Sequence, residues 1–250
     1  MIINQGYNHI EICKQALIDE NLFNTFKSNN KYRIILEHVG YETGLEYLNK
    51  IKSNKDYSII EKCWTKFLEN DVIGTPIKFK YNLSDNLINT NVSPTTLRYI
   101  SIGLDIIKYI QEKKLNNINI CEIGGGYGGQ SKILFDLCNI FNINIIKYKI
   151  IDIPEVSKFQ EKYLTKLNIK NVTFESCLSI NIEEHDLLIS NYALGEFNNE
   201  TQEEYIEKVV KYCKYYYMIW NNHGINEYFK DAIILPEIPE TAEFNKVICK

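Results

Sequence analysis

The sequence predicts an α/β fold in which a mainly parallel sheet carries helices on both faces. Two observations support this prediction. Short apolar segments alternate with helical ones from about residue 93 onward, and a glycine-rich turn, 124–129, joins the first of these apolar segments to a helix. Such alternation implies crossover connections between parallel strands. The 250 residues suffice for one large domain with its own core.

Residues 1–92 are expected to form a helical N-terminal region that covers an acceptor site or makes a subunit contact. Apolar residues recur there at helical spacing, and His9 and His38 fall on the helices so predicted. Residues 59–68 read as one longer helix that ends at Gly74 to Pro76. The stretch 80–92 is rich in Asn, Ser and Asp, which predicts a linker or an ordered loop.

Residues 93–250 are expected to form the sheet domain. Ser93 followed by Pro94 is typical of a helix start, with a hydroxyl cap and proline at the first helical position. Strands are predicted at 118–123, 145–151, 172–174, 186–190, 215–220, 233–235 and 246–249. Helices are predicted between them, through 133–141, from Pro154 to about 167, and over 201–212.

Composition excludes several classes of protein. The 28 basic and 32 acidic residues give a net charge of −4, which lacks the broad positive field of a nucleic-acid-binding protein. No stretch approaches the ~18 apolar residues of a membrane span, and the polar start lacks a signal core. The seven cysteines are scattered and form no CxxC pair, which predicts free thiols in a reducing compartment. We therefore expect a cytoplasmic protein.

The glycine-rich turn fits two ligand motifs. Gly124, Gly126 and Gly129 match the GxGxxG of dinucleotide binding, whereas Glu122, Gly124, Gly126 and Gly128 match ExGxGxG, the first motif of class I methyltransferases that use S-adenosylmethionine. Glu122 favours the methyltransferase motif. A dinucleotide would place its diphosphate where this carboxylate repels it, whereas S-adenosylmethionine carries an ammonium and a sulfonium.

Further residues are expected to contact such a cofactor. Asp152 ends the second strand, where an acid accepts ribose hydroxyls, although a cap for the helix at Pro154 is the alternative. Arg98 is suited to the cofactor carboxylate or to an anionic sugar nucleotide, unless it is a surface side chain. The full expected set is Glu122, Gly124, Gly126, Tyr127, Gly128, Asp152, Cys177, Leu178, Asn191 and Arg98.

From about His38 onward the chain resembles the sugar O-methyltransferases encoded in surface-polysaccharide and glycan gene clusters. The similar segments are EHVG at 37–40, GLEYL at 44–48, SPTTLRY at 93–99, CEIGGGYGGQ at 121–130, IDIPEV at 151–156 and SNYALGE at 190–196. The resemblance implies a Rossmann-like class I methyltransferase fold. It also implies methyl transfer from S-adenosylmethionine to a hydroxyl of a sugar or sugar nucleotide.

Methyl transfer to a sugar hydroxyl calls for a group that removes the hydroxyl proton. His223 follows the fifth strand and has a suitable ordinary pKa, so we expect it to be the base, with a solvated loop histidine as the alternative. Glu196 is expected to orient the acceptor, unless it only begins a helix. Tyr192, Asn221 and Asn222 are the expected acceptor contacts.

Other readings of the same residues remain open. One acid beside His223 offers fewer oxygen ligands than a hard cation requires, so no metal is expected. A nicotinamide-dependent oxidoreductase is the rival enzyme, and a non-catalytic domain that binds cofactor or glycan is the rival of another class. A subunit contact through residues 1–92 would make a homodimer.

Overall fold

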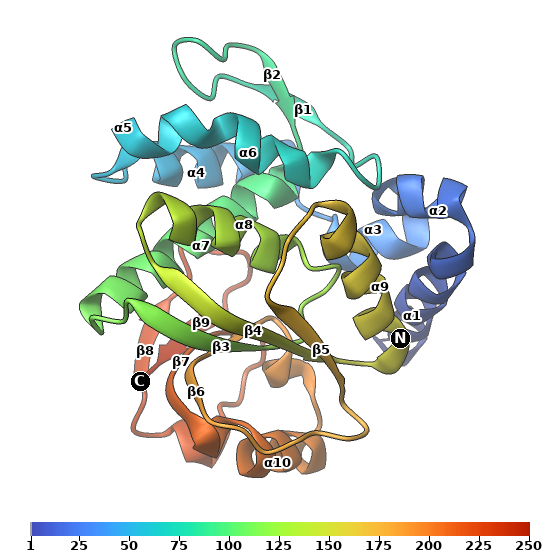
Figure 1. The fold of residues 1–250 in the computed structure, drawn as a ribbon, viewed down its shortest axis with the longest axis vertical. Coiled ribbons are helices and arrows are strands. Elements are labelled where there is room, and N and C mark those ends of the chain that lie inside the picture. Colours follow the sequence, from blue (N-terminus) through green and yellow to red (C-terminus); the bar gives the residue numbers. More distant parts are fainter. Residues whose placement is uncertain (1) are drawn as a thin grey trace.

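The computed structural model describes residues 2–250, and their side chains from Asn8 onward. A seven-stranded sheet lies at its centre (Figure 1). The strands run in the order β5 (Val172–Ser176), β4 (Asn144–Asp152), β3 (Asn117–Ile123), β6 (His185–Asn191), β7 (Cys213–Trp220), β9 (Lys246–Cys249) and β8 (Ile233–Pro236). The first five are parallel, and β9 is antiparallel to both of its neighbours. The predicted mainly parallel sheet is confirmed.

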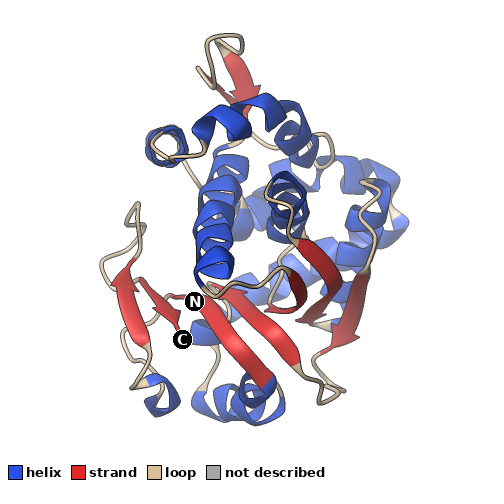
Figure 2. Cartoon of the chain, turned by 60° about the vertical axis from the view of Figure 1, so that its left-hand side comes forward, coloured by secondary structure: helices blue, strands red, loops and turns tan. Residues whose placement is uncertain are grey.

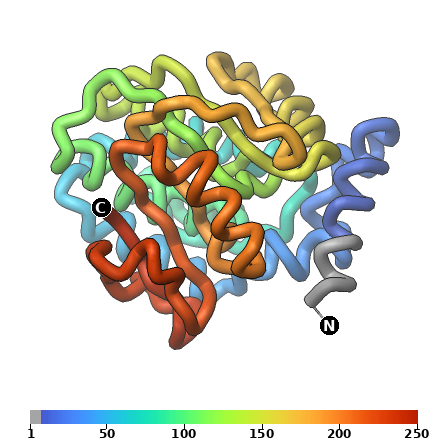
Figure 3. Tube along the Cα trace, turned by 90° about the horizontal axis from the view of Figure 1, so that it is seen from below, coloured from blue at the N-terminus to red at the C-terminus, as the bar shows by residue number. Residues whose placement is uncertain are grey.

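Helices cover both faces of the sheet, as the sequence predicts. The helices α7 (Pro94–Glu112), α8 (Gly129–Ile140) and α9 (Pro154–Lys166) pack on one face. The other face is covered by α10 (Asn199–Lys208), the orange helix in front of the sheet when the molecule is seen from below (Figure 3). Figure 2 shows the strands passing between these two layers. In residues 2–250, no helix combines the length and apolar character that a membrane crossing requires.

The N-terminal helices share the core of the sheet domain. They are α1 (Ile2–Ile18), α2 (Glu20–Thr25), α3 (Asn30–Leu36), α4 (Tyr41–Lys52), α5 (Tyr57–Ile60) and α6 (Trp64–Leu68). The buried ring of Phe26 lies 4.8 Å from Phe159 on α9 and 5.5 Å from Tyr127 in the glycine turn, centroid to centroid. One apolar cluster therefore runs across residue 92, so the described helices before it pack as a layer of the same core, called here the N-terminal layer.

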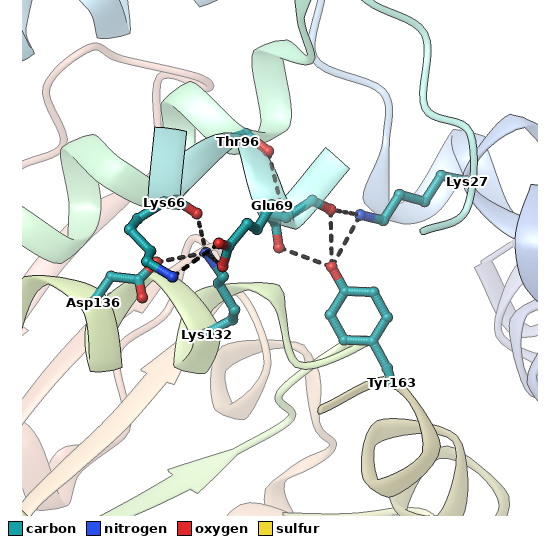
Figure 4. Close-up of polar contacts among 8 residues, drawn as sticks. Lys27, Lys66, Glu69, Thr96, Lys132, Asp136 and Tyr163 are labelled. Carbon is teal, nitrogen blue, oxygen red and sulfur yellow. Dashed lines mark hydrogen bonds and ion pairs between the residues drawn. The ribbon is translucent and has the colours of Figure 1, made fainter. Parts of the chain in front are cut away.

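Buried polar contacts join the same two regions (Figure 4). The Lys27 ammonium donates to the carbonyl oxygen of Asn70 at 2.5 Å and to the hydroxyl oxygen of Tyr163 at 3.2 Å. On the adjacent side, the fully buried Lys132 of α8 pairs with Asp136 of the same helix at 2.5 Å and with Glu69 of the N-terminal region at 3.6 Å. A buried charge is tolerated only where it is paired or hydrogen-bonded, so these contacts fix the N-terminal layer in one position.

The start of α7 is built as predicted and is tied to the N-terminal layer. The Ser93 side chain accepts from the Thr96 backbone N–H at 3.1 Å, and Pro94 occupies the first helical position. The buried carboxylate of Asp71 accepts from the Ser93 backbone N–H, the Ser93 hydroxyl and the Thr96 hydroxyl at 2.7–2.8 Å. Charge-assisted bonds of this kind are the strong ones, so Asp71 holds the amino end of α7 in place.

Three local expectations are wrong. The segment 80–92 is not a plain loop, because β1 (Phe79–Tyr81) and β2 (Thr90–Val92) pair in an antiparallel hairpin. Each strand has only three residues, too few to give a periodic signal, and the polar residues form the turn between them. The helix predicted at 59–68 is interrupted by a 3₁₀ turn over Glu61–Cys63. Helix α3 ends at Leu36, so His38 lies in the connection to α4.

Candidate active site

The glycine turn takes a backbone path that only glycine adopts without strain. Gly124, Gly126 and Gly128 have positive φ angles of 73°, 58° and 93°. A Cβ on Gly124 would lie 2.3 Å from the Cβ of Ala193. The Gly124 amide donates to the Ile151 carbonyl at 3.0 Å, which pins the turn to the end of β4. The turn thus leaves β3 at the carboxyl edge of the sheet, where open α/β folds bind ligands.

A cavity of about 470 Å³ opens in front of this turn. Its walls come from the end of α3 and the connection after it, the start of α7, the ends of β6 and β7, and the loop between β8 and β9. The lining residues are Ile35, Leu36, His38, Arg98, Tyr99, Ile102, Glu122, Gly124, Gly125, Gly126, Gln130, Asn191, Tyr192, Glu196, Asn221, Thr241, Ala242, Phe244 and Asn245. The cavity therefore unites eight of the predicted site residues, which come from four separate stretches of the chain.

Two acids stand at the strand ends beside the turn. Glu122 is 2% exposed and accepts from the Tyr148 hydroxyl at 2.8 Å, and burial raises its pKa to about 7. Asp152 accepts from the Ile153 amide at 2.8 Å and from the Gln160 side chain at 2.7 Å, and burial raises its pKa to about 6. A cationic or hydrogen-bond-donating ligand would favour the ionised form of both acids, so the pair suits such a ligand.

Several buried polar atoms of the cavity lack a hydrogen-bond partner within the described structure. They include both amide atoms of Asn191, the side-chain oxygen of Gln130, the Nε of Arg98 and the side-chain oxygen of Asn221. Leaving a buried donor or acceptor unpaired costs ~1–3 kcal/mol. Because these atoms gather in one cavity, a polar ligand bound there would restore their bonds. The amino-acid end of S-adenosylmethionine, with an ammonium and a carboxylate, fits this donor and acceptor set.

Arg98 is the cation of the cavity. It is 6% exposed, donates to the Leu36 carbonyl at 3.2 Å, and lies over the Tyr99 and Tyr192 rings at 5.5 and 5.6 Å. No carboxylate of the described side chains comes within 4.0 Å of its guanidinium. The surface alternative for Arg98 is therefore wrong, and its charge is available to an anionic group.

Tyr192 follows β6 in a strained conformation. Its φ is 59°, a value that side-chain-bearing residues avoid, and its hydroxyl donates to the buried carboxylate of Glu237. The same carboxylate accepts from the Thr241 amide at 3.1 Å and the Asn245 side chain at 3.0 Å. Glu237 thus joins Tyr192 to the β8–β9 loop that closes one side of the cavity. Strain of this kind is typical of functional sites.

The predicted acceptor residues divide into two groups. Glu196 and Asn221 line the cavity, and the Asn221 amide donates to the Glu196 carboxylate at 2.5 Å. Burial raises the pKa of Glu196. Asn222 instead donates to the Gly195 carbonyl at 3.0 Å, and His223 is exposed, with its ring 4.4 Å from Phe244. Neither Asn222 nor His223 lines the cavity. The predicted roles of Asn222 as an acceptor contact and of His223 as the base stay predictions.

The remaining predicted cofactor residues do not line the cavity; they are Tyr127, Gly128, Asp152, Cys177 and Leu178. Tyr127 is fully buried beneath the turn, where the Lys27 ammonium lies 4.3 Å from its ring. The Cys177 amide donates to the Asp152 carbonyl at 2.8 Å, and Leu178 is 82% exposed. Cys177 and Leu178 therefore follow the neighbouring strand beside Asp152, and their contact with a cofactor stays a prediction. The described residues contain no cluster of three or more His, Cys, Asp or Glu that could hold a metal.

Sequence reasoning missed part of the cavity wall. His38, Gln130, Thr241, Phe244 and Asn245 line it, and none was expected to do so. Gln130 closes the glycine motif, so its position was a usable signal. The residues of the β8–β9 loop carry no motif, and only the folded chain brings them to β6.

The fold has the layout of the Rossmann-like class I methyltransferase fold: a parallel sheet with one antiparallel strand beside its edge strand, and a glycine turn after β3. No protein-family profile and no curated protein sequence matches the chain.

Solved structures of similar fold include methyltransferases from several organisms. One, from Pyrococcus horikoshii, is described as a candidate RNA methyltransferase; it is 11% identical over 63% of this chain and 82% of its own, with a TM-score of 0.43. Another, from Methanococcus maripaludis, is described as a candidate S-adenosylmethionine-dependent methyltransferase; it is 14% identical over 60% and 83%, with a TM-score of 0.44. A candidate methyltransferase from Escherichia coli is 12% identical over 59% and 84%, with a TM-score of 0.43.

Proposed function

We propose that this protein transfers a methyl group from S-adenosylmethionine to a hydroxyl of a sugar or sugar nucleotide. One observation carries the proposal: the buried Glu122 and the half-buried Asp152, both with raised pKa values, lie beside the glycine turn. Glu122 also lines the cavity, together with Arg98, which forms no ion pair with a described carboxylate. An acid is unfavourable beside a diphosphate and favourable beside an ammonium. Glu122 therefore supports S-adenosylmethionine over a nicotinamide dinucleotide, whereas Asp152 suits the ribose of either ligand.

The cofactor would supply an electrophilic methyl group, and the chain would hold it by the following residues. Arg98 would bind the carboxylate of the amino-acid end, while Glu122 and Asn191 would accept from its ammonium. Asp152 would accept from the ribose hydroxyls, and the segment at Cys177 and Leu178 would meet the adenine edge. The backbone of Gly124, Gly126 and Gly128 would allow the close approach that this packing needs.

The acceptor would lie on the side of the cavity formed by the ends of β6 and β7. Tyr192, Glu196 and Asn221 offer an aromatic face, a carboxylate and an amide there, the groups that recognise sugar hydroxyls and ring faces. Glu196, positioned by Asn221, would accept a hydrogen bond from an acceptor hydroxyl and so fix its orientation. The resemblance of segment 190–196 to sugar O-methyltransferases supports a sugar acceptor and a role in glycan or polysaccharide biosynthesis.

Two measurements test this proposal in sequence. Calorimetry with S-adenosylhomocysteine and with NAD separates the two cofactor classes, and we expect binding of the first alone. Formation of S-adenosylhomocysteine from S-adenosylmethionine is then followed with a panel of sugars and sugar nucleotides. Binding of NAD without binding of S-adenosylhomocysteine would overturn the cofactor. Turnover of a non-sugar hydroxyl compound in preference to every sugar would overturn the acceptor class.

A further inference from the structure

We propose that His38, from the N-terminal layer, is the catalytic base that takes the proton of the acceptor hydroxyl. This inference rests on the proposed methyl transfer and names a residue of the same cavity. It would place a group of the N-terminal layer in direct contact with the acceptor, so that the layer is part of the catalytic machinery and not only a cover.

The geometry of His38 leaves one ring nitrogen free to accept a proton. Its Nδ1 lies 2.9 Å from the carbonyl oxygen of Ile35, and a carbonyl can only accept a hydrogen bond. Nδ1 therefore carries the hydrogen, and Nε2 carries the lone pair. The ring also lines the cavity and remains exposed to solvent. A base so placed can take a proton from a bound hydroxyl and release it to water.

The backbone around His38 is held against both halves of the site. Leu36 packs on the glycine turn, with a side-chain carbon 3.4 Å from the place that a Cβ on Gly126 would occupy. Arg98 donates to the Leu36 carbonyl and lies over the ring of Tyr192, the residue that begins the acceptor side. The connection that carries His38 thus begins at a residue packed on the glycine turn, and Arg98 links it to the acceptor side of the cavity.

The surroundings keep the imidazole neutral. Partial desolvation at the cavity wall and the nearby Arg98 lower the pKa of His38, while its bond to Ile35 opposes this. The other titratable groups that line the cavity are Glu122 and Glu196, with the hydroxyls of Tyr99 and Tyr192. At about pH 7 a histidine with a lowered pKa is mostly unprotonated, which is the form a base needs.

The step balances without any further reactant. The acceptor oxygen forms a bond to the methyl carbon as the carbon–sulfur bond breaks, and that bond's electron pair stays on sulfur. The hydroxyl proton passes to Nε2 of His38, which becomes an imidazolium. The imidazolium then gives this proton to solvent, and the neutral ring is restored.

The first experiment reads the ring directly and does not need an acceptor. Long-range ¹H–¹⁵N spectra of the four histidine rings are recorded against pH, with and without S-adenosylhomocysteine, and His38→Gln identifies the His38 signals. We expect a proton on Nδ1, a pKa below the ordinary value of 6.5, and a signal that moves when S-adenosylhomocysteine binds. His185 is the internal control, because its Nδ1 also faces a backbone carbonyl but it lies at the opposite end of β6, so its signal should stay fixed.

Several results of this experiment would overturn the proposal. A proton on Nε2 in the neutral ring would do so, as would a His38 signal indifferent to S-adenosylhomocysteine in a protein that binds it. A pKa that rises above 6.5 on binding would make His38 a partner of the cofactor carboxylate instead. If S-adenosylhomocysteine does not bind at all, that result would instead contradict the proposed function.

The second experiment compares His38→Gln with His223→Gln, using an acceptor that the panel identifies. His38→Gln should lower kcat by roughly 10²–10⁴-fold, remove the acidic limb of the rate profile, and leave affinity for S-adenosylhomocysteine nearly unchanged. If His223→Gln does this and His38→Gln does not, the base is His223. Retention of the acidic limb in both variants would pass the role to Glu196 or to solvent.

Discussion

Replacing Glu122 by Gln should make the ligand-free protein more stable and the cofactor bind more weakly. Glutamine keeps the shape of the side chain and can still accept from the Tyr148 hydroxyl, but it removes the charge. The buried carboxylate is unfavourable in the empty cavity and becomes favourable only beside the ammonium of the ligand. Stability and binding should therefore change in opposite directions, as expected where a functional group is destabilising in the absence of its ligand.

The size of the stability gain follows from the pKa. Burial raises the pKa of Glu122 from 4.5 to about 7, and each pKa unit corresponds to ~1.4 kcal/mol. The ionised side chain therefore costs ~3 kcal/mol of folding free energy. Below pH 4.5 the carboxyl is protonated in both states and the cost is absent; it grows as the pH rises and is complete above about pH 7. The gain in Glu122→Gln should appear over that window.

The assay is urea unfolding of the wild type and Glu122→Gln across the window, paired with calorimetry of S-adenosylhomocysteine. The difference in unfolding free energy between the two proteins should widen by ~3 kcal/mol between about pH 4.5 and pH 8. Affinity should fall by roughly 10–100-fold, the effect of losing one charge-assisted hydrogen bond. Wild-type affinity should also weaken as the pH falls below about 7, and this dependence should shrink in the variant.

A pH-independent stability difference would refute the reasoning, since it would mean that Glu122 has an ordinary pKa in the folded protein. Unchanged affinity in Glu122→Gln would refute the role of this acid toward the ammonium. Tyr148→Phe is a useful companion variant, because it removes the hydroxyl that stabilises the carboxylate and should raise the pKa of Glu122 further.

Other expected outcomes concern the second acid, the buried lysine, the arginine and the N-terminal layer. Asp152→Ala should weaken S-adenosylhomocysteine binding by ~1–3 kcal/mol in calorimetry. Burial lowers the pKa of Lys27 from 10.5 to about 8. Chemical unfolding should therefore show that the unfolding free energy of the wild type rises by ~3 kcal/mol relative to that of Lys27→Met as the pH increases from about 8 to 10.5. Arg98→Lys should weaken S-adenosylhomocysteine binding more than it weakens adenosine binding, because it alters only the carboxylate contact. A chain that starts near Asn91 should fail to unfold cooperatively, because it lacks the layer that holds Lys27 and Asp71.

The sequence predicted those features whose cause is local. The strands β3 and β4 lie inside the sheet and are rich in isoleucine, a β-branched residue that favours strands, so their composition identifies them. The glycine turn could also be predicted, because three positive φ angles in five residues exclude most residues other than glycine. Glu122 and Asp152 were predictable from their place at strand ends, since the carboxyl ends of parallel strands meet at one edge.

The N-terminal layer was harder to predict because its role depends on contacts between distant segments. His38 follows apolar residues at helical spacing, and nothing in that spacing shows that α3 ends at Leu36. The end is set by packing: Leu36 meets the glycine turn and its carbonyl accepts from Arg98, which lies 62 positions further along the chain. A pattern of spacing reports the face that a helix buries but not the partner that stops it.

The buried charges explain why this layer and the site form one unit. Lys27 bonds the Asn70 carbonyl and lies against Tyr127 of the glycine turn, and Asp71 holds the amino end of α7, where Arg98 lies. Removing either partner of such a contact strands a buried polar group, which costs more than the contact itself contributes. The arrangement therefore fixes the position of the layer over the turn more strongly than apolar packing alone would. A cavity wall held in that way keeps His38, Arg98 and the turn in one geometry before any ligand binds, which is the condition under which binding energy is directed to the reacting groups.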